Sequence, residues 1–125
     1  VEVIEAKSGV LLKKLNIQSN RAGVLMPNGN MAFGTIHGEI VYINRKFNEV
    51  RRVRLSDTAI SSVTNWKKGL VVTTVGKTAF FVNEKAIVSQ RFDLGSAYSA
   101  VFGHMTSDDD FVSFLSSRYR LYTFR

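Results

Sequence analysis

The sequence predicts an all-β protein of short antiparallel strands. Apolar, β-branched and aromatic residues alternate with polar ones in short runs along most of the chain, which is the pattern of half-buried strands. No stretch places apolar residues at the i, i+3, i+4 and i+7 spacing of an amphipathic helix. A weak internal repeat of about forty residues adds an expectation about architecture, because a fixed period of that length is typical of repeat folds.

The expected strands follow one another and are separated by short turns. Asn28-Gly29, after Pro27, supplies the left-handed backbone that a tight turn requires. Polar residues at 106–110 indicate another turn. The expected strands are 1–6, 10–17, 22–26, 31–36, 39–44, 49–55, 59–65, 69–75, 78–83, 86–93, 98–103, 111–116 and 119–124.

The repeat begins at Gly29, Gly69 and Asp110, at spacings of 40 and 41 residues. Each start is followed by an apolar run, and then by a second run with an aromatic residue at its centre. Laid out in groups of four strands, the chain is a single β-repeat domain over 1–125. Its expected parts are a partial unit at 1–17, full units at 22–55 and 59–94, and a partial unit at 97–125. The side chains expected to be buried are Val41, Tyr42, Val71, Phe80, Phe81, Val112 and Leu121.

The opening strands at 59–63 and 97–101 are rich in small and apolar residues, and they precede the Gly-led and aromatic strands. This order resembles the blades of a β-propeller of the WD-repeat-like superfamily. The resemblance implies four-stranded antiparallel blades, with the first strand nearest the central channel and the fourth at the rim. The chain departs from the family pattern, because no Trp-Asp dipeptide ends a third strand. Those positions hold Ile43-Asn44, Val82-Asn83 and Phe124-Arg125.

A β-trefoil is the alternative fold, because it also has three repeats of about forty residues. The Gln-any-Trp motif of trefoil lectins is absent, and the single Trp66 has no counterpart in the other repeats. A propeller needs about four to eight blades to close, whereas the repeat accounts for about three. We therefore expect more of a longer polypeptide, a second copy of this chain or a different protein to complete the ring. The first residue, Val1 rather than Met, also favours a piece of a longer protein.

Composition excludes several kinds of chemistry. The chain has 125 residues and no Cys, so a disulfide, a thiolate metal site and a Cys nucleophile are unavailable. It has no apolar run of membrane-spanning length and no signal peptide at its start, so we expect an intracellular protein, cytoplasmic or nuclear, with no membrane partner. The net charge of +7 favours an acidic or polyanionic partner.

The sequence predicts no catalytic, cofactor or metal site. Consecutive side chains of an extended chain point in opposite directions, so the run Asp108 to Asp110 is not expected to hold one ion. His37 and His104, the two histidines, fall in loops of different repeats. No serine lies in a Gly-any-Ser-any-Gly elbow, and the glycines open no phosphate-binding helix. We therefore do not expect an enzyme.

Positive charge gathers at one place, the expected fourth strand of the first full unit and the turn before it. Five of the ten residues from 45 to 54 are basic and one, Glu49, is acidic. Such a patch fits phosphates or the acidic surface of a protein partner, or it guards a sheet edge against aggregation. The candidate partner- or phosphate-binding residues are Arg45, Lys46, Arg51, Arg52 and Arg54.

The sequence thus predicts a non-catalytic protein-interaction scaffold, a propeller segment that docks partners in a larger intracellular assembly. Self-association is one way of completing it. The alternative is a basic nucleic-acid-binding β-module that contacts the phosphate backbone through the same five residues.

Overall fold

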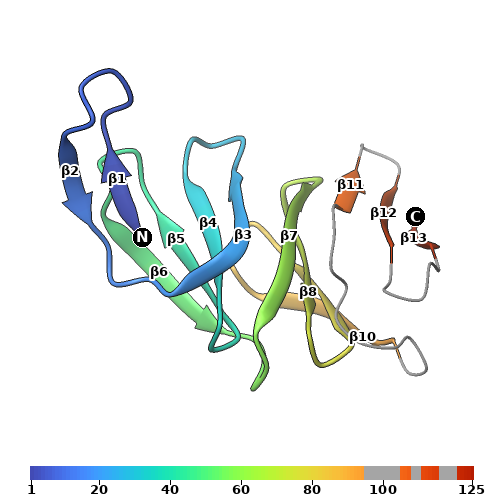
Figure 1. Cartoon of the computed structure of the whole chain (residues 1–125). Helices are drawn as coiled ribbons and strands as arrows, with labels where there is room; N and C mark the ends of the chain where they lie inside the picture. Colours follow the sequence, from blue (N-terminus) through green and yellow to red (C-terminus); the bar gives the residue numbers. More distant parts are fainter. Residues whose placement is uncertain (95–104, 108–110, 116–120) are drawn as a thin grey trace.

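The computed structural model describes residues 1–94, 105–107, 111–115 and 121–125. Every regular element in these residues is a β-strand, and the strands form four antiparallel sheets in chain order (Figure 1). The first sheet is the hairpin of β1 (Glu2–Ile4) and β2 (Leu11–Lys14). The second contains β3 (Ser19–Leu25), β4 (Met31–Thr35), β5 (Glu39–Ile43) and β6 (Glu49–Arg54). The third contains β7 (Ile60–Trp66), β8 (Gly69–Thr74), β9 (Thr78–Val82) and β10 (Val88–Asp93). The fourth contains β11 (Met105–Ser107), β12 (Val112–Leu115) and β13 (Leu121–Phe124).

Twelve of these strands match the expected ones in order and approximate position. The expected strand at 98–103 lies outside the described residues. The turn expected at 106–110 is wrong at its start, because β11 includes Thr106 and Ser107 and pairs with β12. Thr and Ser are common in turns and at sheet edges alike, so their presence alone did not locate the boundary.

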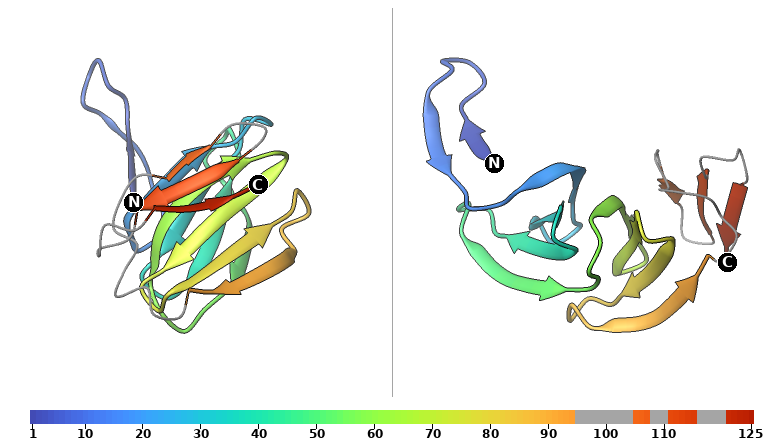
Figure 2. Two further views of the ribbon diagram at one scale, coloured as in Figure 1. Left: turned by 90° about the vertical axis from the view of Figure 1, so that its right-hand side faces the viewer. Right: turned by 60° about the horizontal axis from the view of Figure 1, so that its bottom comes forward.

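The sheets follow one another along an arc, from the N-terminal hairpin to the C-terminal sheet (Figure 2). β7 contacts β3 and β4 of the sheet before it and β11 of the sheet after it, so the first strand of each sheet lies on the inner side. β6 and β10 lie on the outer side and are mostly exposed. This is the radial arrangement of propeller blades, and stacked sheets of this kind are not those of a β-trefoil.

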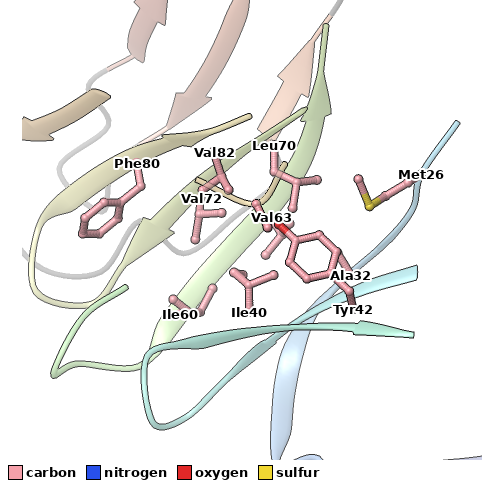
Figure 3. Close-up of a cluster of buried hydrophobic side chains, with 11 residues drawn as sticks. Met26, Ala32, Ile40, Tyr42, Ile60, Val63, Leu70, Val72, Phe80 and Val82 are labelled. Atoms are coloured by element: carbon pink, nitrogen blue, oxygen red, sulfur yellow. The ribbon is translucent and has the colours of Figure 1, made fainter. Parts of the chain in front are cut away.

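The main core lies between the second and third sheets (Figure 3). Its third-sheet side includes Phe80, whereas the neighbouring Phe81 points to the opposite face and packs toward the fourth sheet against Phe124. β8 and β9 are therefore buried along their whole length, since a sheet covers each of their faces. The cluster contains Met26, Ala32, Ile40, Tyr42, Ile60, Val63, Leu70, Val72, Phe80, Val82 and Ala86.

Most of the expected core is confirmed. The buried residues among those predicted are Val41, Tyr42, Val71, Phe80 and Phe81. The prediction for Leu121 is wrong, because its side chain is 68% exposed. Leu121 and Phe124 are three positions apart in β13 and so face opposite ways. Phe124 packs on the third sheet and Leu121 lies on the outward face of the last sheet. The side chain of Val112 lies outside the described residues.

The second and third sheets repeat with an offset of 39 residues. Met31 pairs with Ile43 in one, and Leu70 pairs with Val82 in the other. The expected alignment of Gly29 with Gly69 is therefore shifted by one residue. The reason is the turn before the second strand, whose length differs between the two sheets.

The turn between the third and fourth strands of each four-stranded sheet has one design. The Oδ1 atom of Asn44 accepts hydrogen bonds from the backbone N–H groups of Lys46 and Asn48, each at 3.0 Å. Thirty-nine residues later, Asn83 Oδ1 accepts from Lys85 and Ile87, at 2.9 and 3.1 Å. The asparagines that stand where a Trp-Asp dipeptide would end thus build the turn to the outer strand.

Candidate functional site

The five basic residues singled out by the sequence lie on β6 and in the turn before it, at the outer side of the arc. The strand carries them on two faces. Arg51 lies opposite Tyr42 in the ladder, on the face toward the third sheet, and Arg52 lies opposite Val41, on the face toward the N-terminal hairpin. The five charges therefore do not form one plane.

Arg52 is held inside the protein. Its Nε donates to Glu49 Oε1 at 2.7 Å, and its Nη1 lies 3.2 Å from Glu39 Oε1. Its Nη2 donates to the carbonyl oxygen of Asn16 at 2.9 Å, in the segment that leads from the hairpin to the second sheet. The hydrogen bond from Arg52 to Glu49 is the main cause that raises the pKa of the guanidinium. Arg52 therefore ties the first two sheets together.

Arg51 lies beside a buried hydroxyl. Burial raises the pKa of Tyr42, and the positive charge of Arg51 acts in the opposite direction. Within the described residues the Tyr42 hydroxyl has no hydrogen-bond partner. Arg51 itself has no ion pair in this part of the chain, so its charge faces solvent.

The other three basic residues are exposed. Arg45 covers Gly29 so closely that a Cβ there would stand 2.0 Å from the Arg45 Nε. Lys46 follows Arg45 in the same turn. Arg54 ends β6 and reaches Asp57 at 3.3 Å, a pair that contributes little because both side chains are well exposed.

A cavity of about 410 Å³ lies where the second and third sheets diverge at their outer strands. The connection from β6 to β7 lines one side, with Ser56 Oγ and Thr58 Oγ1 2.9 Å apart. Arg91 of β10 lines the other side, 5.5 Å above the ring of Phe80. The sequence analysis missed Arg91; the offset of 39 residues, which aligns it with Arg52, was the signal that pointed to it.

A second cavity, of about 630 Å³, lies between the third and fourth sheets and is lined by Trp66, Lys67, Phe81 and Arg125, among others. The Lys67 ammonium lies 4.6 Å from the Trp66 ring centre. The Trp66 and Phe81 rings are 4.9 Å apart, so Trp66 belongs to the core between these sheets. Packing explains this tryptophan without a ligand.

The residues considered for catalysis do not come together. His37 is exposed, and its Nε2 lies 2.9 Å from Gln18 Oε1. His104 and the run 108–110 lie outside the described residues. Within the described ranges no three His, Cys, Asp or Glu side chains gather closely enough for a metal ion. This part of the chain also has no helix long and apolar enough to cross a membrane.

No protein-family model and no curated protein matches the sequence. The fold, in contrast, is similar to solved structures. The Cps50 (Swd1) β-propeller domain of Myceliophteria thermophila is 10% identical, with a TM-score of 0.68 over 90% of this chain and 36% of that one. The computationally designed Ika4 protein is 16% identical, with a TM-score of 0.76 over 98% of this chain and 77% of that one. BamB from Moraxella catarrhalis is 15% identical, with a TM-score of 0.64 over 86% and 33%.

The chain is therefore part of a divergent β-propeller, as the order of its strands indicates. It spans about a third of the length of the Swd1 domain and of BamB. Its two four-stranded sheets are complete blades, flanked by a two-stranded and a three-stranded sheet.

Proposed function

We propose that this chain is a non-catalytic docking scaffold, a propeller segment that presents its turns and outer strands to protein partners within an assembly. The observation that carries the proposal is the rigid, doubly covered sheet pair beside exposed apolar faces at both ends of the arc. Among the described residues, ionisable side chains serve as ion pairs and surface charges and do not converge on a reaction centre. The proposal extends to an intracellular, cytoplasmic or nuclear, location.

The ends of the arc support completion by another chain. Val3 packs toward the second sheet, so the next residue of β1, Ile4, faces away from it and is exposed. Leu11 and Leu12 of β2 are also exposed, and Leu121 is exposed at the other end. Apolar faces of this kind mark surfaces that another sheet covers. We propose that a second copy or a partner supplies that sheet.

Sedimentation of the 125-residue chain tests the proposal. We expect concentration-dependent association that L121E weakens, because the charge would be buried on the covered face. I87E is the matched control, since Ile87 is exposed in a turn away from both ends. A compact monomer at every concentration, unaffected by either change, would contradict completion by association.

Binding of the phosphate backbone is the second candidate, favoured by Arg51, which has no ion pair among the described residues. If it applies, affinity for a random oligonucleotide should fall with salt, with a log–log slope of about −0.9 per phosphate contact for duplex and about −0.7 for single strands. R51Q should then flatten the slope by about one unit. A slope that R51Q does not change would leave β6 as a protein-docking or edge-protecting strand.

A further inference from the structure

Arg52 and Arg91 hold the same position in successive blades. Arg52 lies opposite Val41, and Arg91, 39 residues later, lies opposite Phe80. Val41 packs toward the hairpin before it, and Phe80 packs toward the second sheet before it. Each guanidinium therefore lies on the outer strand of its blade, at the junction with the preceding sheet.

The two arginines differ in their partners. Glu39 and Glu49 bind Arg52, and the residues at the equivalent positions of the third sheet are Thr78 and Val88. Arg91 has no ion pair in the described part of the chain. A position that holds two carboxylates in one blade is thus left with an unneutralised guanidinium in the next.

The place of the missing carboxylates is open. The 410 Å³ cavity is bounded by Arg91, Thr78, Phe80 and the 54–58 connection. Such a volume accommodates a side chain and its first contacts. The charge that balances Arg54 is Asp57, which is almost fully solvent-exposed and so provides weak neutralisation.

The hydroxyl pair at the cavity adds a hydrogen-bond donor. Thr58 N–H donates to Ser56 Oγ at 3.0 Å, and Gly76 N–H donates to Thr58 Oγ1 at 3.2 Å. Two hydroxyl groups carry two protons, and one of these lies between the two oxygens. The second proton has no acceptor among the described residues, so it can be donated to a ligand oxygen.

We propose that this cavity binds a carboxylate side chain of a partner protein, with Arg91 as the main charge and the Ser56–Thr58 pair as the hydroxyl donor. The inference rests on the docking function proposed above and names the chemistry of one contact. A carboxylate is favoured because carboxylates fill the equivalent position around Arg52. The phosphate of a phosphoserine peptide has related oxyanion chemistry and is an arm of the test.

Fluorescence anisotropy with labelled short peptides provides the test. The peptides are identical except for two central residues, which are glutamate, glutamine or phosphoserine. The protein variants are R91Q, which removes the guanidinium, and V88E, which restores the repeat's own carboxylate three residues before the arginine. I87E is the matched control, because it adds the same charge to the neighbouring exposed residue.

We expect the glutamate peptide to bind and the glutamine peptide not to bind. R91Q and V88E should each weaken binding about tenfold or more, because each removes a charge-assisted hydrogen bond. I87E should change the affinity less than about threefold. An equal effect of V88E and I87E would overturn the site in favour of general charge attraction.

Absence of binding by both anionic peptides at millimolar concentration would also overturn it. A phosphoserine peptide that binds more than tenfold tighter than the glutamate peptide would overturn the carboxylate assignment, and so would tighter, R91Q-sensitive binding of an oligonucleotide of equal charge. Sedimentation of R91Q and V88E separates the two proposals. If association is retained while peptide binding is absent, the cavity inference fails and the docking scaffold stands.

Discussion

Asn44 and Asn83 make the same two hydrogen bonds in successive blades, each accepting from the backbone N–H groups two and four residues further on. The turn also places Phe47 and Ala86, the residues three positions after each asparagine, at φ angles of 62° and 61°. A left-handed backbone at a residue other than glycine is unfavourable. The asparagine side chain stabilises the turn that contains it.

N83A should therefore lower the free energy of unfolding by about 1–2 kcal/mol, because two side-chain acceptors are lost. N83D keeps an oxygen at the same position and should cost less. Urea denaturation of the three proteins measures the difference. Equal losses for N83A and N83D would show that the amide group, rather than its oxygen, matters.

F81A should cost about 3–5 kcal/mol of unfolding free energy, because it opens a cavity in the aromatic cluster. The Phe81 ring lies 5.4 Å from those of Phe92 and Phe124, so no single neighbour can fill the space. I87A, at an exposed position, should stay within about 0.5 kcal/mol of the parent. Thermal or urea unfolding compares them, and a cost for F81A below about 1 kcal/mol would contradict the packing described.

Y42F should stabilise the protein slightly at neutral pH, by about 1 kcal/mol, since it removes a buried hydroxyl that has no partner among the described residues. Burial raises the pKa of Tyr42 above its unfolded value. The stability that the protonated hydroxyl contributes is present below the unfolded pKa of about 10 and is lost as pH rises through the folded value. Unfolding measured from pH 8 to 11 should show a smaller decline for Y42F than for the parent; identical curves would argue against a perturbed Tyr42.

R52Q and R51Q should separate, although the two residues are adjacent. R52Q breaks contacts to Glu39, Glu49 and Asn16, so we expect a loss of about 1 kcal/mol at low salt that shrinks as salt screens the pairs. R51Q breaks no ion pair in the described residues and should stay within about 0.5 kcal/mol. Urea unfolding at two salt concentrations decides this, and equal effects would contradict the assignment.

Strand order could be predicted from sequence because alternation and turn residues mark each strand locally. The partners of Arg52 could not, since Glu39 and Glu49 come from separate strands and meet only when β5 and β6 pair. The alignment that placed Gly29 over Gly69 hid the equivalence of Arg52 and Arg91, because it is one residue out of step with the ladder. Leu121 could not be placed either. Its apolar character fits a core position, and only the arrangement of the sheets shows that nothing described here covers it.

Each sheet of the arc comes from one contiguous stretch of chain, and its contacts run to the sheets next to it. Closing such a structure needs only short loops, so its topology favours fast folding that starts locally. Energetics of this kind approach a one-dimensional chain of coupled units. Amide protons should exchange most slowly in β8 and β9, which have a sheet on both faces, and fastest in the N-terminal hairpin. Adding a further sheet to either end should therefore slow exchange throughout that end, and the molecule would carry the record of a docked neighbour in its own backbone.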